Sequence, residues 1–208
     1  YSDGKDTNAI YTDRLYENIG GEYFRDRSSK SGINSYKGYG LSVHSVDFNN
    51  DHWPDIYVAN DYLGQDFLWI NNKDGTFRQS LYDYYSKTPL YSMGSDFADF
   101  NNDGLIDHFQ VDMMPDSNYR LKNNYLALPE PFYDNLIAQK TPQYSRNFLM
   151  LRNRDNTFSE VGFFSGVAKT DWSWSCLFGD LDNDGFKDLF VTNGIEKDIP
   201  NADLINAK

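Results

Sequence analysis

Short apolar stretches separated by polar turns recur along the chain, and their length predicts β-strands rather than helices. One set of four covers residues 41–46, 56–59 and 67–70 and continues with a strand that begins at Thr76-Phe77. The last two strands are separated by an Asn-Asn-Lys-Asp-Gly sequence, which is typical of a tight hairpin turn. This set therefore predicts a sheet of four short antiparallel strands.

The set of strands is repeated along the chain. A turn followed by phenylalanine ends at Phe24, Phe77 and Phe158, and an acidic stretch begins about 22 residues after each of them. From an acidic stretch to the next such phenylalanine the distance is about 30 residues in one case and about 59 in the other. The difference predicts an insertion at about 115–144 within a basic period of about 52 residues. Four strands per period, repeated around an axis, are typical of a β-propeller blade.

The predicted fold class is therefore all-β, with blades of four antiparallel strands and an acidic loop between the first and second strands. Residues 1–208 are predicted to be part of one β-propeller. The predicted parts are a closing half-blade at 11–30, a blade at 38–80, a blade with the insertion at 89–161, and an opening half-blade at 171–194. Closed propellers typically have 4–8 blades. The sequence thus predicts a partial propeller, unless its two half-blades meet each other.

The first strand of each period alternates large apolar residues with small ones. Because successive side chains point to opposite faces of a sheet, both faces of this strand are sterically specified. Small residues are expected where innermost strands crowd around a central axis. The large residues are Tyr39, Leu41, Tyr91, Met93, Trp172 and Trp174, and the small ones between them are Gly40, Ser42, Ser92, Gly94, Ser173 and Ser175. Cys176 falls in the same alignment, which favours a small buried thiol over a reactive one.

Three loops carry acidic or amide side chains at every second position, followed by a fourth acid. Calcium prefers six to eight oxygen ligands, and flexible carboxylates with a backbone carbonyl can supply them. A glycine after the third side chain permits the sharp turn that such a loop needs. One acidic turn is ordinary on a solvated surface, but three with the same spacing predict calcium binding. We name them loop one (residues 47–55), loop two (99–107) and loop three (180–188).

The formal net charge is -12, from 19 Lys and Arg against 31 Asp and Glu. An acidic surface repels phosphate backbones, so the composition argues against nucleic-acid binding. Ten of the acidic residues lie in the three loops, and three bound Ca²⁺ would reduce the net charge to -6. The single cysteine allows no intrachain disulfide, and the sequence has no apolar run long enough to predict a transmembrane helix.

Three segments carry a resemblance to a known family: INNKDGTF, YSMGSDFADFNNDGLID and DWSWSCLFGDLDNDGFKDLFVTNG. They resemble the FG-GAP/VCBS repeat, the blade type also found in integrin α-subunit propellers. The chain is most similar to bacterial and animal proteins that resemble cartilage acidic protein, in which such repeats often precede an ASPIC/UnbV domain. No ASPIC/UnbV segment is visible here, so the resemblance implies a fragment of such a protein.

The resemblance also implies a ligand set for each loop, made of four side chains and one backbone carbonyl. Loop one would use Asp47, Asn49, Asp51, Asp55 and the carbonyl of Trp53; loop two Asp99, Asn101, Asp103, Asp107 and the carbonyl of Leu105; loop three Asp180, Asp182, Asp184, Asp188 and the carbonyl of Phe186. Loop one departs from the pattern because His52 stands where glycine is expected, and non-glycine residues rarely adopt positive φ. We therefore predict up to three bound Ca²⁺, with loop three binding most tightly and loop one most weakly.

Two other classes of protein contain similar acidic motifs and must be compared with these loops. An EF-hand loop requires a bidentate Glu at its twelfth position, where this chain has Val58, Gln110 and Val191 between flanking strands. A hydrolase could use paired carboxylates, but those in the loops are committed to metal by the prediction above. His44, His52 and His108 share no metal-ligand spacing, and no catalytic triad order or phosphate-binding loop is visible. The sequence therefore predicts a binding protein rather than an enzyme.

The bacterial relatives implied by the resemblance are exported or surface-associated, some near SusC/SusD-type outer-membrane uptake systems. Millimolar calcium outside cells also favours an extracellular, cell-surface or periplasmic location. We expect a protein or glycan partner, in an outer-membrane transporter complex; the alternative is an accessory region of a polysaccharide-degrading enzyme. Two regions are candidates for contact with a partner. The first is the set of aromatic positions Tyr39, Tyr91, Trp172 and Trp174, although packing between blades is the commoner role of such residues. The second is the insertion around 129–137, which could equally cap a blade edge.

Overall fold

The computed structural model describes residues 12–61, 64–124 and 141–194. Two four-stranded antiparallel sheets form its centre. The first blade has the strand order β3-β4-β5-β6, and the second blade has the order β8-β9-β12-β13. The strands of the first blade are β3 (Gly40–Val46), β4 (Asp55–Asn60), β5 (Phe67–Asn71) and β6 (Phe77–Gln79). Those of the second are β8 (Ser95–Ala98), β9 (Asp107–Gln110), β12 (Phe148–Arg152) and β13 (Phe158–Glu160).

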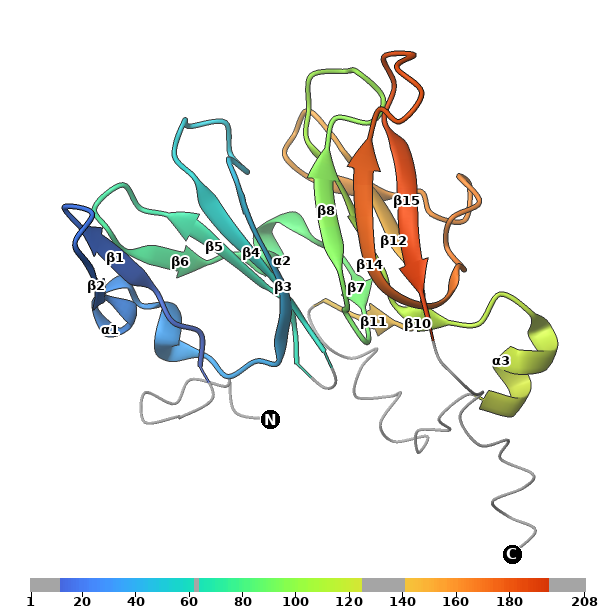
Figure 1. The fold of residues 1–208 in the computed structure, drawn as a ribbon, viewed down its shortest axis with the longest axis horizontal. Helices are drawn as coiled ribbons and strands as arrows, with labels where there is room; N and C mark the ends of the chain where they lie inside the picture. Colours follow the sequence, from blue (N-terminus) through green and yellow to red (C-terminus); the bar gives the residue numbers. More distant parts are fainter. Residues whose placement is uncertain (1–11, 62–63, 125–140, 195–208) are drawn as a thin grey trace, which may run out of the picture.

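A two-stranded hairpin flanks the blades on each side. The N-terminal hairpin is formed by β1 (Tyr16–Ile19) and β2 (Tyr23–Asp26), and the C-terminal hairpin by β14 (Asp171–Gly179) and β15 (Asp188–Asn193). The short strand β10 (Met113–Met114) pairs antiparallel with β14. Figure 1 shows the resulting row, with the N-terminal hairpin at one end, the two blades between, and the C-terminal hairpin near the other end.

The remaining elements are short. Strands β7 (Thr88–Pro89) and β11 (Gln143–Tyr144) form a parallel pair, and the helical segments are α1 (Ser28–Ser31), η1 (Ile33–Ser35), α2 (Leu81–Tyr84) and α3 (Asn118–Asn124). Helix α3 and β11 fall in the predicted insertion, whose segment 129–137 lies outside the described residues. No helix in the described part of the chain is both long and apolar enough to cross a membrane.

Apolar layers fill the spaces between neighbouring sheets. Tyr57 of β4 packs in the layer between the two blades, whereas the next residue, Val58, packs against the segment that follows the N-terminal hairpin. Tyr57 and Val58 enter different layers because successive side chains of a strand point to opposite faces of the sheet. Cys176 is buried in a third layer, between the second blade and the C-terminal hairpin, and burial raises the pKa of its thiol. The prediction of a small buried thiol is confirmed.

The innermost strands approach each other closely. The hydroxyl oxygens of Ser42 on β3 and Ser95 on β8 are 2.9 Å apart. A Cβ atom added at Gly94 would lie 2.6 Å from the Cα of Ser175, a distance that no side chain tolerates. The small residues in the alternating pattern are therefore required by contact between neighbouring first strands.

The protein is thus an all-β partial propeller, as predicted from the sequence. Within the described ranges each sheet has two to four strands, and none of these sheets closes on itself.

Candidate metal centre

All three acidic loops lie at the same end of the sheets, which is the upper end in Figure 1. Each loop connects the first strand of a sheet to the second: β3 to β4, β8 to β9, and β14 to β15. The Nδ2 of Asn102 in loop two donates a hydrogen bond of 2.9 Å to the carbonyl of Gly185 in loop three. Loops two and three are therefore direct neighbours.

The first aspartate closes each loop by accepting hydrogen bonds from the backbone. In loop three the carboxylate of Asp180 accepts from the N–H groups of Asp184 at 3.0 Å and Gly185 at 3.1 Å. Asp47 and Asp99 accept in the same way from the residues four and five positions later. The three loops thus share one backbone conformation, held by the side chain that the motif places first.

The last aspartate ties the loop to the sheet. Asp55 accepts from the N–H of Phe48 within its loop and from the N–H of Asn71 on the third strand, both at 2.8 Å. Asp107 makes the equivalent two bonds, the second from the N–H of Arg152 at 2.8 Å. Burial raises the pKa of Asp55 and raises that of Asp107 to about 6. Both carboxylates sit beside the other acids of their loops, so a bound cation would favour their ionised forms.

Loop three forms the clearest candidate centre. One carboxylate oxygen each from Asp180, Asp182 and Asp184 lie within 4.8 Å of one another, and the described residues contain no other such group of three His, Cys, Asp or Glu. Three like charges this close repel each other, and a cation between them would relieve the repulsion. This group could therefore hold a metal ion.

Loops one and two differ because asparagine replaces the second aspartate. The amide of Asn49 donates to the Oδ2 of Asp51 at 2.8 Å, and that of Asn101 donates to the Oδ2 of Asp103 at 3.0 Å. In loops one and two, the amide at the second position therefore donates a hydrogen bond to a carboxylate oxygen of the third residue. In loop three the second position is an aspartate, which makes no such bond. The structure places all fifteen predicted ligand residues in the three loops: Asp47, Asn49, Asp51, Trp53 and Asp55; Asp99, Asn101, Asp103, Leu105 and Asp107; Asp180, Asp182, Asp184, Phe186 and Asp188.

The residue after the third side chain adopts a left-handed backbone in every loop. The φ angles are 68° at His52, 86° at Gly104 and 93° at Gly185. A non-glycine residue in this conformation costs roughly 1–2 kcal/mol in steric strain. Glycine avoids that strain but loses more conformational entropy on folding, so its net advantage is smaller. Loop one therefore carries backbone strain that the other two loops avoid.

We predict that His52→Gly stabilises the protein by about 0.5–1 kcal/mol, because glycine adopts this φ without a steric penalty. Urea unfolding of the wild type and the variant in chelator measures the difference. The matched control is Gly104→His in loop two, which should lose a similar amount. If His52→Gly is less stable than the wild type, the strain argument is wrong.

A lysine that the sequence motif does not include lies against loop one. Lys73, in the turn between β5 and β6, places its Nζ 3.2 Å from the Oδ2 of Asp51. A second cation, the buried Arg152 of the second blade, donates to the carbonyl of Phe48 and to Asn156 Oδ1 at 2.9 Å. The contacts of Lys73 with Asp51 and of Arg152 with Phe48 join segments far apart in sequence. The loop motif therefore gave no signal for them.

Replacing Lys73 by glutamine should strengthen metal binding at loop one about three- to ten-fold, because the ammonium competes with the ion for Asp51. Calcium titration by calorimetry checks this, with Lys187→Gln in loop three as a control, at loop one, for loss of one positive charge. Equal effects of the two substitutions at loop one would contradict a specific role for Lys73.

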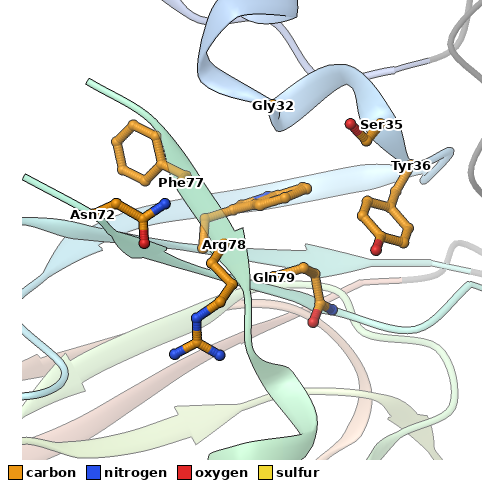
Figure 2. Close-up of a pocket in the computed structure, with 8 residues that line it drawn as sticks. Gly32, Ser35, Tyr36, Asn72, Phe77, Arg78 and Gln79 are labelled. Carbon is orange, nitrogen blue, oxygen red and sulfur yellow. The ribbon is translucent and has the colours of Figure 1, made fainter. Parts of the chain in front are cut away.

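Neither His108 nor the pocket near η1 belongs to the acidic loops. His108 is fully buried in β9, where desolvation lowers its pKa and its Nδ1 lies 3.0 Å from the hydroxyl of Tyr85. A pocket of about 390 Å³ lies between η1 and β6. Figure 2 shows the side chains that line it. It is lined by Gly32, Ser35, Tyr36, Trp69, Asn72, Phe77, Arg78 and Gln79. None of these is acidic, so the cavity offers no ligand set like that of the loops.

Blades of four antiparallel strands, each with an acidic loop after its first strand, define a β-propeller segment with a candidate metal centre. The profile of the FG-GAP-like repeat matches residues 47–109 and 134–191, more than half of the chain. The chain belongs to this family. A comparison of the chain with curated proteins finds no match.

Proposed function

We propose that this chain is a calcium-binding propeller segment that serves in binding rather than catalysis. The observation that carries the proposal is the group of Asp180, Asp182 and Asp184, set in a loop whose hydrogen-bond scheme recurs in loops one and two. The side chains offered at the ligand positions are carboxylates and amides, which are the hard oxygen donors that calcium prefers. Up to three Ca²⁺ would bind, one in each loop.

The structure gives a physical reason for the predicted order of affinities. Loop three offers four carboxylates, loop two offers three and an amide, and loop one offers the same with Lys73 close to Asp51. A full carboxylate set attracts a divalent cation most strongly, and a neighbouring ammonium opposes it. Loop three should therefore bind first and loop one last.

Calorimetric titration with CaCl₂ tests the proposal on the wild type and on Asp180→Ala, Asp99→Ala and Asp47→Ala, each of which removes the first acid of one loop. We expect the tightest site to disappear in Asp180→Ala and the weakest in Asp47→Ala. An exposed acid outside the loops, Asp116→Ala, is the matched control. Absence of calcium binding by the wild type would overturn the proposal, and equal losses in all three variants would overturn the order.

The wider setting of the proposal is an exported or surface-associated bacterial protein similar to cartilage acidic protein. Its support is the resemblance of the repeats and the supply of calcium outside the cell. In this setting the chain contacts a protein or glycan, within a SusC/SusD-type transporter complex at the outer membrane. Purification of the full-length protein with its native partners is the test: an outer-membrane transporter supports this setting, and a polysaccharide-cleaving activity in the same chain favours the accessory role.

A further inference from the structure

We propose that the pocket between η1 and β6 binds a neutral sugar ring of the hexopyranose class. This inference rests on the binding role proposed above, for which it names a ligand class and a place, and it does not involve the calcium loops. All the residues that line the pocket lie between residues 32 and 79, so the described part of the chain supplies both of its walls.

The pocket lies at one of two equivalent junctions between a short helix and the sheet that follows it. Helix α1 follows the N-terminal hairpin, and α2 follows the first blade. The chain enters both helices in the same way, because the backbone N–H groups of Arg27 before α1 and of Ser80 before α2 donate to equivalent carbonyls, at 2.9 Å and 2.7 Å. Both helices have four residues, so Gly32 after α1 is equivalent to Tyr85 after α2.

A glycine at this position opens the pocket. The ring of Tyr85 stacks on Phe158 of the second blade, with the ring centroids 4.7 Å apart. The equivalent phenylalanine of the first blade is Phe77, since each of the two begins the fourth strand of its blade. A Cβ atom added at Gly32 would lie 3.5 Å from the carbonyl oxygen of Phe77, which is an ordinary contact. Gly32 is therefore beside Phe77 but has no ring to place over it, and the space remains as the pocket.

Small side chains in α1 keep this space open. The helix carries Ser28 and Ser31 where α2 carries Leu81 and Tyr84. The resulting pocket has a volume of about 390 Å³. Small-molecule sites typically measure roughly 300–1,000 Å³, so this pocket accommodates a single ring with its substituents.

Trp69 supplies the observation that points to a ligand. Its side chain lines the pocket and is 1% exposed, and its Nε1 is buried with no hydrogen-bond partner in the described part of the chain. Buried polar groups nearly always have a partner in the protein or in a bound molecule. The equivalent residue of the second blade is Met150, which has no such donor. The indole N–H is therefore a donor that the fold does not use and that a ligand oxygen can accept.

The other lining groups match the two kinds of surface that a sugar ring presents. Figure 2 shows Phe77 and Tyr36 toward opposite sides of the pocket, with Gln79 between them. The aromatic rings offer apolar faces to the C–H groups of a sugar. The Oε1 of Gln79 accepts from the N–H of Leu81 at 3.1 Å, which leaves its Nε2 donors for a ligand. Sugar hydroxyls both donate and accept, so they can pair with this amide and with Trp69, whereas the aromatic side chain of a peptide would leave most of these groups unpaired.

The charge of the pocket favours a neutral ligand. Among the residues that line it, Arg78 alone is charged, and its guanidinium pairs with Asp83 at 2.9 Å. Figure 2 shows this guanidinium turned away from Gly32 and Ser35 on the other wall. An anionic ligand would have to compete with Asp83 for Arg78, whereas a neutral sugar leaves that ion pair intact.

Nuclear magnetic resonance of the chain with ¹⁵N-labelled tryptophan is the first test. The four tryptophans should give four indole N–H signals, and the signal that is lost in Trp69→Phe belongs to Trp69. The probes are D-glucose, D-galactose and D-mannose at concentrations up to tens of millimolar, in calcium-containing buffer. At least one sugar should shift the Trp69 signal saturably and leave the other indole signals in place. If no sugar shifts the Trp69 signal, the proposal is overturned.

Affinities of variants for the same sugar test the role of the lining groups. Trp69→Phe keeps a ring but removes the indole N–H, and should weaken binding about three- to ten-fold through loss of one hydrogen bond. Ser35→Tyr, at a half-exposed lining position, should abolish binding because the larger side chain occupies the pocket. Tyr119→Phe is the matched control, since it removes one polar group from a ring of α3 that is 73% exposed, and should leave the affinity unchanged. Wild-type affinity in both Trp69→Phe and Ser35→Tyr would place the sugar elsewhere and overturn the proposal.

Two further measurements separate this inference from its alternatives. If N-acetyl-tyrosine amide shifts the Trp69 signal at lower concentration than any of the sugars, the pocket takes an aromatic side chain of a peptide and the proposal is overturned. Calcium titration of Trp69→Phe should match that of the wild type, because the pocket contains no residue of the acidic loops. Calcium binding without sugar binding would overturn this inference alone, whereas sugar binding without calcium binding would support it and overturn the calcium sites.

Discussion

Removal of calcium should lower the melting temperature of the chain by at least about 10 °C. A ligand held at 100 times its Kd stabilises the folded state by about 2.7 kcal/mol, and each kcal/mol shifts the melting temperature of a domain this size by roughly 2–4 °C. Two or three saturated loops therefore exceed this figure. The physical source is the carboxylate repulsion in loop three, where the oxygens of three aspartates lie within 4.8 Å of one another.

Thermal unfolding in 2 mM CaCl₂ and in excess chelator measures this shift, with MgCl₂ at the same concentration as the ion control. Magnesium requires near-ideal octahedral geometry and gives up its water reluctantly, so it should restore little of the stability. The variant Asp180→Asn with Asp184→Asn keeps the shape of loop three but removes two charges, and should lose that loop's share of the shift. A melting temperature that chelator leaves unchanged would contradict a structural role for calcium.

The parts of the fold that the sequence predicted are those specified by local pattern. The spacing of turns and acidic loops located the strands of both blades, because each strand is bounded by its own turn residues. The pairing of β10 with β14 and the parallel pair of β7 with β11 were not predicted. Strands β7, β10 and β11 have only two residues each, too few to show any periodicity, and they form where the chain passes a neighbouring sheet.

The candidate site divides in the same way. The order of acids in the motif identified the loop aspartates, and the structure confirms a possible metal-holding group at Asp180, Asp182 and Asp184. Lys73 and Arg152 were missed because each reaches loop one from a segment distant in sequence. Such contacts depend on how sheets pack, and a motif read along one strand contains no information on them.

Between pH 4 and pH 7, the calcium-free protein should lose roughly 2 kcal/mol of stability through Asp66 alone. This side chain is fully buried between the blades, and burial raises its pKa from 3.8 to about 6. Across this window the folded state binds more protons than the unfolded state, so the free energy of unfolding falls as pH rises. The contribution reaches its full value only below the unfolded pKa of 3.8 and is lost once the pH passes the folded pKa of about 6.

Asp66→Asn should remove this dependence without disrupting the site. The asparagine oxygen can still accept from the N–H of Asn60, as Asn147 does from Asp112 in the second blade. The partners of Oδ2 are the hydroxyls of Tyr57 and Ser92 and the amide of Gln110, and each of these groups can turn to accept a hydrogen bond instead of donating one. The neutral side chain therefore keeps its contacts and adds no titrating group.

Urea unfolding in chelator at pH 4 and pH 7 measures the effect as a difference between wild type and variant. This comparison cancels the contributions of the other buried acids, such as Asp112, whose pKa burial raises to about 7. The variant should gain roughly 2 kcal/mol on the wild type between the two pH values. Asp116→Asn, at an exposed position, should track the wild type. Parallel curves for wild type and Asp66→Asn would mean that Asp66 stays ionised, stabilised by its four donors against the cost of burial.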